Sequence, residues 1–381
     1  MRKIHLTALS FLFLPTSFVL ADAPGNLSPS VKDNSAGMSV NLEFLWWTPS
    51  ENTQPYAQVV TTEDVVGVSL DTSGYPSGYN QSLDLNWAPG FHVGLGWDTK
   101  RDHWDLLLDW TCYYNHTKKT KTFATHSATD TNTGLSGSEN GIGIYGTWLG
   151  EWFPSGAADF LDEVPIQLVS PGPFSSAESS WTLHYNVVDL KAGRGFLSKY
   201  NLFKPFFGIQ SAFIKRTLSV NYTGYANLGS LLTFVPTYNG FSNGSYNGSM
   251  HFSGLGPTFG FFDQVKLPYH MHLFGGFAAS LLYGSMIGED SFSLSNLVAG
   301  TSTPFGGGSF NDKNSWIPAT HLQLQLGLGW KFLFSENSMF LDFGAAWESN
   351  LWMFNNFHNS VNEGTTQITL QGLTAFTTFG F

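Results

Sequence analysis

Large apolar side chains alternate with polar or small ones along residues 322–334. Leu322, Leu324 and Leu326 begin the apolar series, while Gln323 and Gln325 begin the polar one. A period of two residues is typical of a β-strand that has one apolar and one polar face. The apolar side continues over more residues than most strands of globular proteins possess. The pattern therefore predicts a long strand with two different faces.

Other segments repeat this alternation, so that the sequence predicts about ten strands in all. They cover about residues 40–47, 91–97, 104–115, 181–192, 202–216, 252–262, 271–283, 322–334, 339–347 and 367–381. Short turns follow residues 97, 192, 262 and 334, whereas long polar loops occupy about 49–84, 117–179, 217–250, 285–318 and 351–366. Bacterial outer-membrane barrels sort their connections in this way, with brief periplasmic turns and longer outer loops. A β-sandwich, the alternative fold, has no reason to do so.

The physics of a bilayer explains why such strands would form a barrel. In hydrocarbon, every backbone N–H and C=O group must be paired within the protein, and strands achieve this only in a closed sheet. We therefore predict an all-β, transmembrane, antiparallel up-and-down β-barrel of about 10 strands, or about 12 if the 117–179 loop adds a hairpin. Tryptophans near the strand ends predict aromatic girdles at the two membrane interfaces. Those near the short turns are Trp97, Trp104 and Trp330, and those near the long loops are Trp46, Trp47, Trp110, Trp181, Trp347 and Trp352.

The N-terminus carries the features of an export signal. Arg2 and Lys3 precede an apolar stretch over residues 6–20, which ends at the small residue Ala21. This pattern predicts a secretory signal peptide. A short membrane anchor is the alternative, although the stretch is shorter than the roughly 20 residues that a helical span needs. We expect a signal peptide at 1–21, a flexible N-terminal segment at 22–37 and an outer-membrane barrel at 38–381.

Composition excludes several other classes of protein. Only 12% of the residues are charged, and the mean hydropathy is −0.06. After the N-terminus the sequence contains no apolar stretch long enough for a helical span, and this argues against a helical membrane protein. An aromatic content of 16% argues against a disordered chain. The formal net charge of −11 comes with no basic patch for nucleic acid. The single cysteine, Cys112, can form no internal disulfide.

Motifs that could carry chemistry have simpler explanations. Residues 141–146 (GIGIYG) match the spacing of a dinucleotide-binding loop, but the sequence offers no βαβ unit around them. His270 and His272 could form a metal pair, but no third ligand lies near them in the sequence. Acidic residues of the longest loop could serve a surface protease, although loop acids are usually only solvated. They are Asp130, Glu139, Asp159, Asp162 and Glu163. We therefore expect no enzyme, no catalytic or metal-binding residues and no cofactor.

The polar register of the predicted strands gives the candidate functional residues. They are Glu43, His92, Asp105, Asp109, His184, Gln210, Arg216, Gln323, Gln325, Lys331, Asp342 and Glu348. Walls of mixed charge suit a water-filled passage, and because acids outnumber bases among them, a mild preference for cations is expected. The alternative is a closed interior in which these polar side chains pair with one another, as in small barrels.

Several strand segments resemble the Legionella-type major outer membrane protein family, which is also found in chlamydia-like bacteria. They are residues 90–98 (GFHVGLGWD), 104–110 (WDLLLDW), 181–190 (WTLHYNVVDL), 205–208 (PFFG) and 254–257 (GLGP). The resemblance extends from about Leu42 onward and implies a pore-forming outer-membrane protein. The C-terminal strand, which ends at Phe381, is similar to the signal that such barrels present to their assembly machinery. Chlamydial members are rich in cross-linked cysteines, a pattern from which this sequence departs.

From these observations we predict a porin of the bacterial outer membrane that lets small hydrophilic solutes and ions diffuse through a polar lumen. The alternative is a structural or adhesive surface barrel with a closed lumen, which binds a surface ligand through its long outer loops. The expected partners are outer-membrane lipid, the barrel assembly machinery and small hydrophilic solutes, but no nucleic acid. The sequence marks no subunit interface, so a homo-oligomer stays an open alternative.

Overall fold

The computed structural model describes residues 37–51, 56–61, 77–99, 104–122, 128–129, 136–137, 143–145, 174–224, 241–298, 301–334, 339–359 and 362–381. The predicted signal peptide and the loop acids between residues 130 and 163 lie outside the described residues. Within the described part of the chain no helix is long and apolar enough to cross a membrane.

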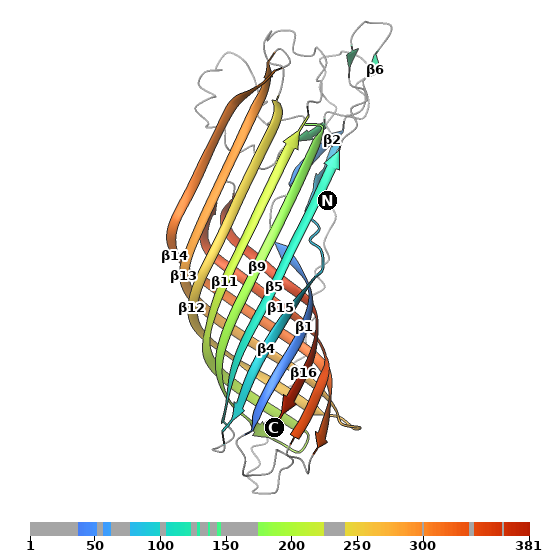
Figure 1. Ribbon diagram of the computed structural model, residues 1–381, viewed down its shortest axis with the longest axis vertical. Coiled ribbons are helices and arrows are strands. Elements are labelled where there is room, and N and C mark those ends of the chain that lie inside the picture. Colours follow the sequence, from blue (N-terminus) through green and yellow to red (C-terminus); the bar gives the residue numbers. More distant parts are fainter. Residues whose placement is uncertain are drawn as a thin grey trace.

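Ten long strands form one closed antiparallel barrel (Figure 1). They are β1 (Met38–Glu51), β4 (Ala88–Asp98), β5 (Trp104–Thr122), β9 (Ser176–Arg194), β11 (Asn201–Thr223), β12 (Phe241–Lys266), β13 (Met271–Val298), β14 (Thr301–Phe334), β15 (Met339–Asn359) and β16 (Asn362–Gly380). Pairing of β16 with β1 and of β9 with β11 gives every long strand two hydrogen-bonded neighbours. Because the sheet has no free edge, its backbone groups can be paired inside a bilayer. The predicted fold class is therefore confirmed.

Short strands accompany the barrel. The strands β2 (Ala57–Thr61), β3 (Ser77–Gln81) and β8 (Gly143–Tyr145) form a small sheet, and β10 (Phe196–Leu197) pairs with the start of β11. The strands β6 (Ala128–Thr129) and β7 (Ser136–Gly137) form a hairpin within the predicted 117–179 loop. This hairpin makes a sheet of its own and does not enlarge the barrel.

The strands are longer than the sequence pattern predicts. β13 and β14 contain 28 and 34 residues, so that the long loops expected at 285–318 and 351–366 are mostly strand. Figure 1 shows β5, β9, β11, β12, β13 and β14 rising together beyond the shorter strands. We call this extension the outer wall. Its outward side is rich in serine, threonine and asparagine, so backbone pairing continues there without the apolar alternation that marks the membrane-facing part.

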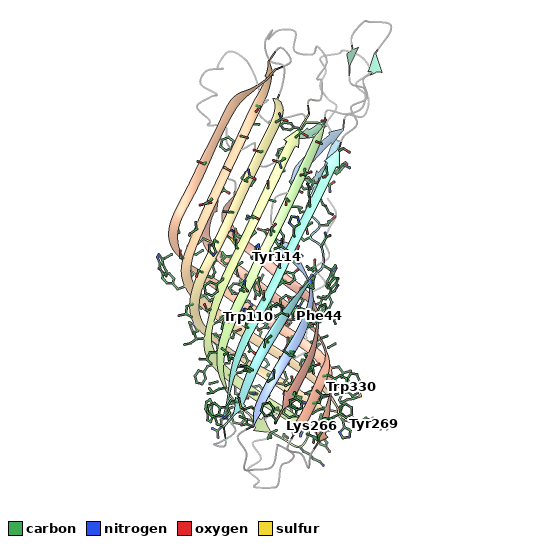
Figure 2. All side chains as sticks on the ribbon, in the orientation of Figure 1. Phe44, Trp110, Tyr114, Lys266, Tyr269 and Trp330 are labelled. Atoms are coloured by element: carbon green, nitrogen blue, oxygen red, sulfur yellow. The ribbon has the colours of Figure 1, made fainter. Side chains whose placement is uncertain are left out.

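Apolar side chains cover the outside of the lower barrel. On β14, Leu324 and Leu326 are about half exposed and face outward, whereas Gln323 and Gln325 face inward. Figure 2 shows Trp110 and Tyr114 at the upper part of this covered region and Trp330, Lys266 and Tyr269 at its lower end. This distribution is the one expected for a lipid-facing belt with aromatic residues toward its borders.

Part of the predicted outer girdle is wrong. Trp46, Trp110 and Trp347 are exposed on the outside, but Trp47, Trp181 and Trp352 are completely buried inside the barrel. Trp46 and Trp47 are adjacent in a strand, and successive side chains of a strand point to opposite faces. The pattern of large side chains alone does not reveal which of the two faces the lipid.

Candidate functional site in the barrel interior

The interior receives eleven of the twelve residues that the sequence predicts to line it. The exception is His184, which lies on the outer face of β9. Its ring packs against Tyr114 of β5 at a centroid distance of 4.7 Å, and Tyr114 is an exposed residue. The inward positions of β9 at this height are apolar, namely Trp181, Leu183 and Tyr185, so the polar and apolar faces are exchanged there. The prediction for His184 is therefore wrong.

Four neighbouring strands place a chain of titratable groups near the middle of the barrel. The Glu43 Oε2 atom lies 3.0 Å from Nδ1 of His92, whose Nε2 atom lies 3.0 Å from Oδ1 of Asp109. The ammonium group of Lys191 lies 3.3 Å from Oδ2 of Asp109 and 3.6 Å from Oδ2 of Asp189. The His92 ring therefore lies between the Glu43 and Asp109 carboxylates, and the Lys191 ammonium group lies between those of Asp109 and Asp189, so each carboxylate has a nitrogen group beside it.

This chain continues across the interior to the opposite wall. Gln210 donates a hydrogen bond from Nε2 to Oδ1 of Asp189 (2.8 Å), and its Oε1 atom lies 3.0 Å from Nδ1 of His321. The other ring nitrogen of His321 lies 3.1 Å from Oδ1 of Asn350. Asn350 in turn donates to Oε1 of Glu348 (3.0 Å). The contact between Gln210 and His321 joins β11 to β14, which are not neighbours in the sheet.

The chain returns to its starting strand through two further donors. Thr374 donates to Oε2 of Glu348 (3.0 Å), and Trp47 of β1 donates from Nε1 to the Thr374 hydroxyl (3.2 Å). Gln323 gives Glu348 another hydrogen bond of 2.7 Å. We call these connected side chains the interior network. Its members are Glu43, His92, Asp109, Lys191, Asp189, Gln210, His321, Asn350, Glu348, Gln323, Thr374 and Trp47. Because hydrogen bonds satisfy its members, they can be buried without large cost.

On the side of the interior formed by β4, β5 and β11, exposure is higher near the periplasmic end than at the level of His321. Lys204 and Asp105, which form an ion pair near the short turns, are 29% and 22% exposed in their side chains. His92 is 19% exposed at the level of the interior network, and His321, further toward the outer end, is only 2% exposed. Water therefore reaches this side of the lower interior, although His272 near the short turns is only 5% exposed in its side chain, and water is excluded at the level of His321.

Beyond the interior network, toward the outer end, apolar side chains fill the barrel. They form one buried cluster that includes Leu45, Trp181, Leu183, Tyr185, Ile214, Leu218, Val220, Tyr222, Tyr246, Met250, Phe252, Met286, Ile317, Trp352, Phe354 and Ile368. Tyr56, Ala57 and Phe174, from segments outside the long strands, complete it. Side chains that lined a water-filled passage would be exposed to that water, whereas these are 5% exposed or less. We call this cluster the apolar core.

Buried polar groups within the apolar core are paired. Arg216 Nη2 lies 2.8 Å from Oε1 of Glu51, and Trp181 donates to Oε2 of the same carboxylate at 2.7 Å. Tyr246 donates to Oδ1 of Asp290 (2.8 Å); burial, with the nearby Asp290 carboxylate, raises the pKa of Tyr246. A cavity of about 170 Å³ lies beside this region, lined by Pro49, Ser50, Glu51, Leu83, Leu85 and Trp181.

The two histidines considered as a metal pair do not act together. His270 has a left-handed backbone conformation (φ 63°) in the turn before β13 and stacks near Phe332, whereas His272 is buried in the interior, 3.5 Å from Asp342. Across the described residues, no three His, Cys, Asp or Glu side chains gather as a metal site would require.

Several members of the interior network are not among the residues predicted from the sequence. Asp189 and Lys191 alternate on the inward side of β9, as His321 does with Gln323 on β14. Their spacing of two residues is the signal that could have found them. Trp47, Asn350 and Thr374 give no comparable signal, because their partners lie on strands that are distant in the sequence.

Comparison with known proteins agrees with this architecture. The family model described as Legionella pneumophila major outer membrane protein precursor matches residues 30–381. No curated protein matches the chain. Similar solved structures include the outer membrane protease OmpT from Escherichia coli, with 10% identity, a TM-score of 0.33 and coverage of 92% of this chain and 99% of that chain. They also include a Pseudomonas aeruginosa FadL homologue, with 9% identity, a TM-score of 0.28 and coverage of 91% and 90%.

These likenesses correct one expectation. The sequence-based expectation that the chain is not an enzyme does not follow from a barrel fold, because one similar solved barrel is a protease. At this identity and TM-score the likeness assigns no activity to this chain.

Proposed function

The chain belongs to the Legionella pneumophila major outer membrane protein family and is a protein of the bacterial outer membrane, and from this premise we propose that it is a surface barrel with a closed lumen. Its barrel would anchor the outer wall, which would present polar side chains to the surroundings of the cell. The observation that carries this proposal is the apolar core, which fills the outer end of the barrel.

The energetics of the apolar core favour a lumen that stays closed. Burying one large apolar side chain contributes roughly 1.5–3 kcal/mol. Trp181, Trp352 and Phe252 are all fully buried in it. Opening a passage would expose several such side chains to water at once, so thermal fluctuation alone would populate an open state rarely.

A diffusion channel for small hydrophilic solutes is the second candidate. The graded exposure of the lower interior favours it, because polar side chains such as His92, Asp105 and Lys204 stand in reach of water from the periplasmic end. Acids outnumber bases among the predicted lining residues, so such a channel would prefer cations. For this function the apolar core would have to move aside.

Single-channel conductance in a planar bilayer distinguishes the two candidates. The parent protein is compared with Trp352→Ala, which removes a buried ring from the core, and with Trp347→Ala, which removes an exposed ring from the lipid face. A closed barrel predicts no steady openings for the parent or for Trp347→Ala, and brief openings for Trp352→Ala. Steady openings of the parent, with a reversal potential that favours cations in a salt gradient, would instead establish the channel. Heat-modifiable gel mobility verifies that each protein is folded.

A further inference from the structure

A row of polar side chains crosses the outside of the barrel on four adjacent strands. In the register of the sheet, Tyr114 of β5 pairs with His184 of β9, His184 pairs with Lys215 of β11, and Lys215 pairs with His251 of β12. All four side chains are exposed and point away from the barrel. Directly paired residues of neighbouring strands have Cβ atoms about 5 Å apart. The four side chains therefore form one continuous strip.

The strip lies immediately above the lipid-facing belt. Phe213 is the last exposed aromatic residue on β11, and Lys215 follows it on the same face. Two residues advance a strand by roughly 7 Å. On β5, Tyr114 lies above Trp110, as Figure 2 shows. This is the depth at which the headgroups of the outer leaflet begin.

Two more donors extend the strip on β5. His116 and Lys118 are exposed on the same face as Tyr114. His116 Nδ1 lies 3.0 Å from the Thr182 hydroxyl, so its other ring nitrogen is the one available to a ligand. We call the six side chains the basic row: Tyr114, His116, Lys118, His184, Lys215 and His251.

The other strands of the barrel have no counterpart at this height among the side chains that the structure describes. Among the side chains that the structure describes, the outward positions just above the belt on the other strands carry no lysine, arginine or histidine. They are Ser50 on β1, Pro89 on β4, Tyr283, Ser285 and Ile287 on β13, Trp316 and Pro318 on β14, Leu351 and Met353 on β15, and Thr369 and Gln371 on β16. The described donors at this height therefore lie together on β5, β9, β11 and β12, in a chain whose formal net charge is −11.

Carboxylates near the basic row neutralise only part of it. Lys118 forms an ion pair with Glu178 (2.7 Å), and Glu289 lies on β13, diagonally beyond His251. Among the described residues, Lys215 has no carboxylate within ion-pair distance. An ammonium group between two imidazoles, all at headgroup depth, is thus available to an anion.

We propose that the basic row binds the phosphate groups of outer-leaflet lipid headgroups. Phosphate oxygens accept hydrogen bonds from ammonium groups, from imidazole N–H groups in either protonation state, and from a phenol. Basic residues beside a membrane surface attract anionic headgroups in this way. The lipid chains would then lie along the exposed apolar residues below the row, Trp110, Phe213 and Leu255. The inference is independent of whether the lumen conducts.

Native mass spectrometry of the detergent-purified, exported protein with bisphosphorylated lipid A as the probe tests this proposal. Lys215→Gln is expected to weaken lipid A binding about fivefold, and the triple variant His184→Gln/Lys215→Gln/His251→Gln more strongly. The matched control is Lys199→Gln, which removes the same charge from an exposed site at the periplasmic end and should bind lipid A like the parent. The variants are expected to fold normally, because all these positions are exposed.

The parent protein alone provides a second measurement that does not depend on any variant. It should bind bisphosphorylated lipid A more tightly than the same glycolipid after removal of its phosphates, and inorganic phosphate at millimolar concentration should not displace the lipid. Equal binding of both glycolipids would overturn the proposal, as would a triple variant that binds lipid A like the parent. The proposal would also be overturned if Lys199→Gln lost as much lipid A binding as Lys215→Gln. Binding would then depend on the net charge of the protein and not on the position of the lysine in the basic row.

Discussion

Gln210 and His321 meet across the inside of the barrel, with 3.0 Å between Oε1 of Gln210 and Nδ1 of His321. Their strands, β11 and β14, are separated in the sheet by β12 and β13. The contact is possible because the inward side chains between them are small. Gly256 and Thr258 of β12 and Ser280 of β13 leave room for the two longer side chains to reach each other. A polar layer thus lies across the barrel directly below the apolar core.

The first prediction concerns the stability that this layer provides. Gln210→Leu removes the donor to Asp189 and the acceptor beside His321, and both partners are buried. A buried polar group left without a partner costs about 1–3 kcal/mol. The free energy of unfolding of the variant, measured by urea denaturation, should be lower than that of the parent by this amount. Gln325→Leu is the control, because Gln325 also faces inward but is only partly buried. Equal losses in the two variants would contradict a specific role for the contact across the barrel.

The second prediction tests which face of β14 contacts lipid. Leu326 is 48% exposed on the outside, and Arg at a lipid-facing position near the midplane costs roughly 2–4 kcal/mol. Leu326→Arg should therefore fold with a correspondingly lower free energy of unfolding in lipid vesicles. Gln325→Arg should fold normally, since Gln325 faces the interior and pairs in register with Glu348. If Gln325→Arg fails to fold while Leu326→Arg folds like the parent, the two faces are inverted.

The lipid-facing part of the barrel was the part that the sequence could predict. All ten strands were found because one face of each must be apolar, and this imposes a period of two on residues such as Leu324 and Leu326. The outer wall escaped detection because water contacts its outward side. The interior was harder still. That His321 meets Gln210, or that Trp47 faces inward, depends on how the sheet closes, and no local pattern encodes that closure.

The third prediction concerns the buried ion pair at the border of the apolar core. Glu51 and Arg216 have side chains that are 2% and 4% exposed. Removing one partner of a buried pair leaves an uncompensated charge, which costs about 3–5 kcal/mol. Glu51→Gln should lower the free energy of unfolding by this amount, and Glu51→Gln combined with Arg216→Met should lower it by less than the sum of the two single changes.

The exposed pair of Lys118 and Glu178 is the control for this cycle. Its side chains are 54% and 40% exposed, and exposed pairs contribute about 0–1 kcal/mol. Glu178→Gln should therefore leave the urea unfolding midpoint almost unchanged. Additive effects of Glu51→Gln and Arg216→Met would show that the two side chains do not depend on each other.

The last prediction uses two glycines that differ in the space around them. A Cβ atom at Gly256 would overlap the backbone of Leu281 and Leu282 on β13, whereas a Cβ at Gly275 would meet its nearest neighbour, the Gln325 carbonyl oxygen, at 3.5 Å. Backbone cannot rotate aside as a side chain can, so Gly256→Ala should force β12 and β13 apart and cost about 1–3 kcal/mol. Gly275→Ala meets only ordinary van der Waals contact and should stay within about 0.5 kcal/mol of the parent. Urea unfolding followed by tryptophan fluorescence measures both changes, and a stable Gly256→Ala would mean that the two strands do not approach as closely as described.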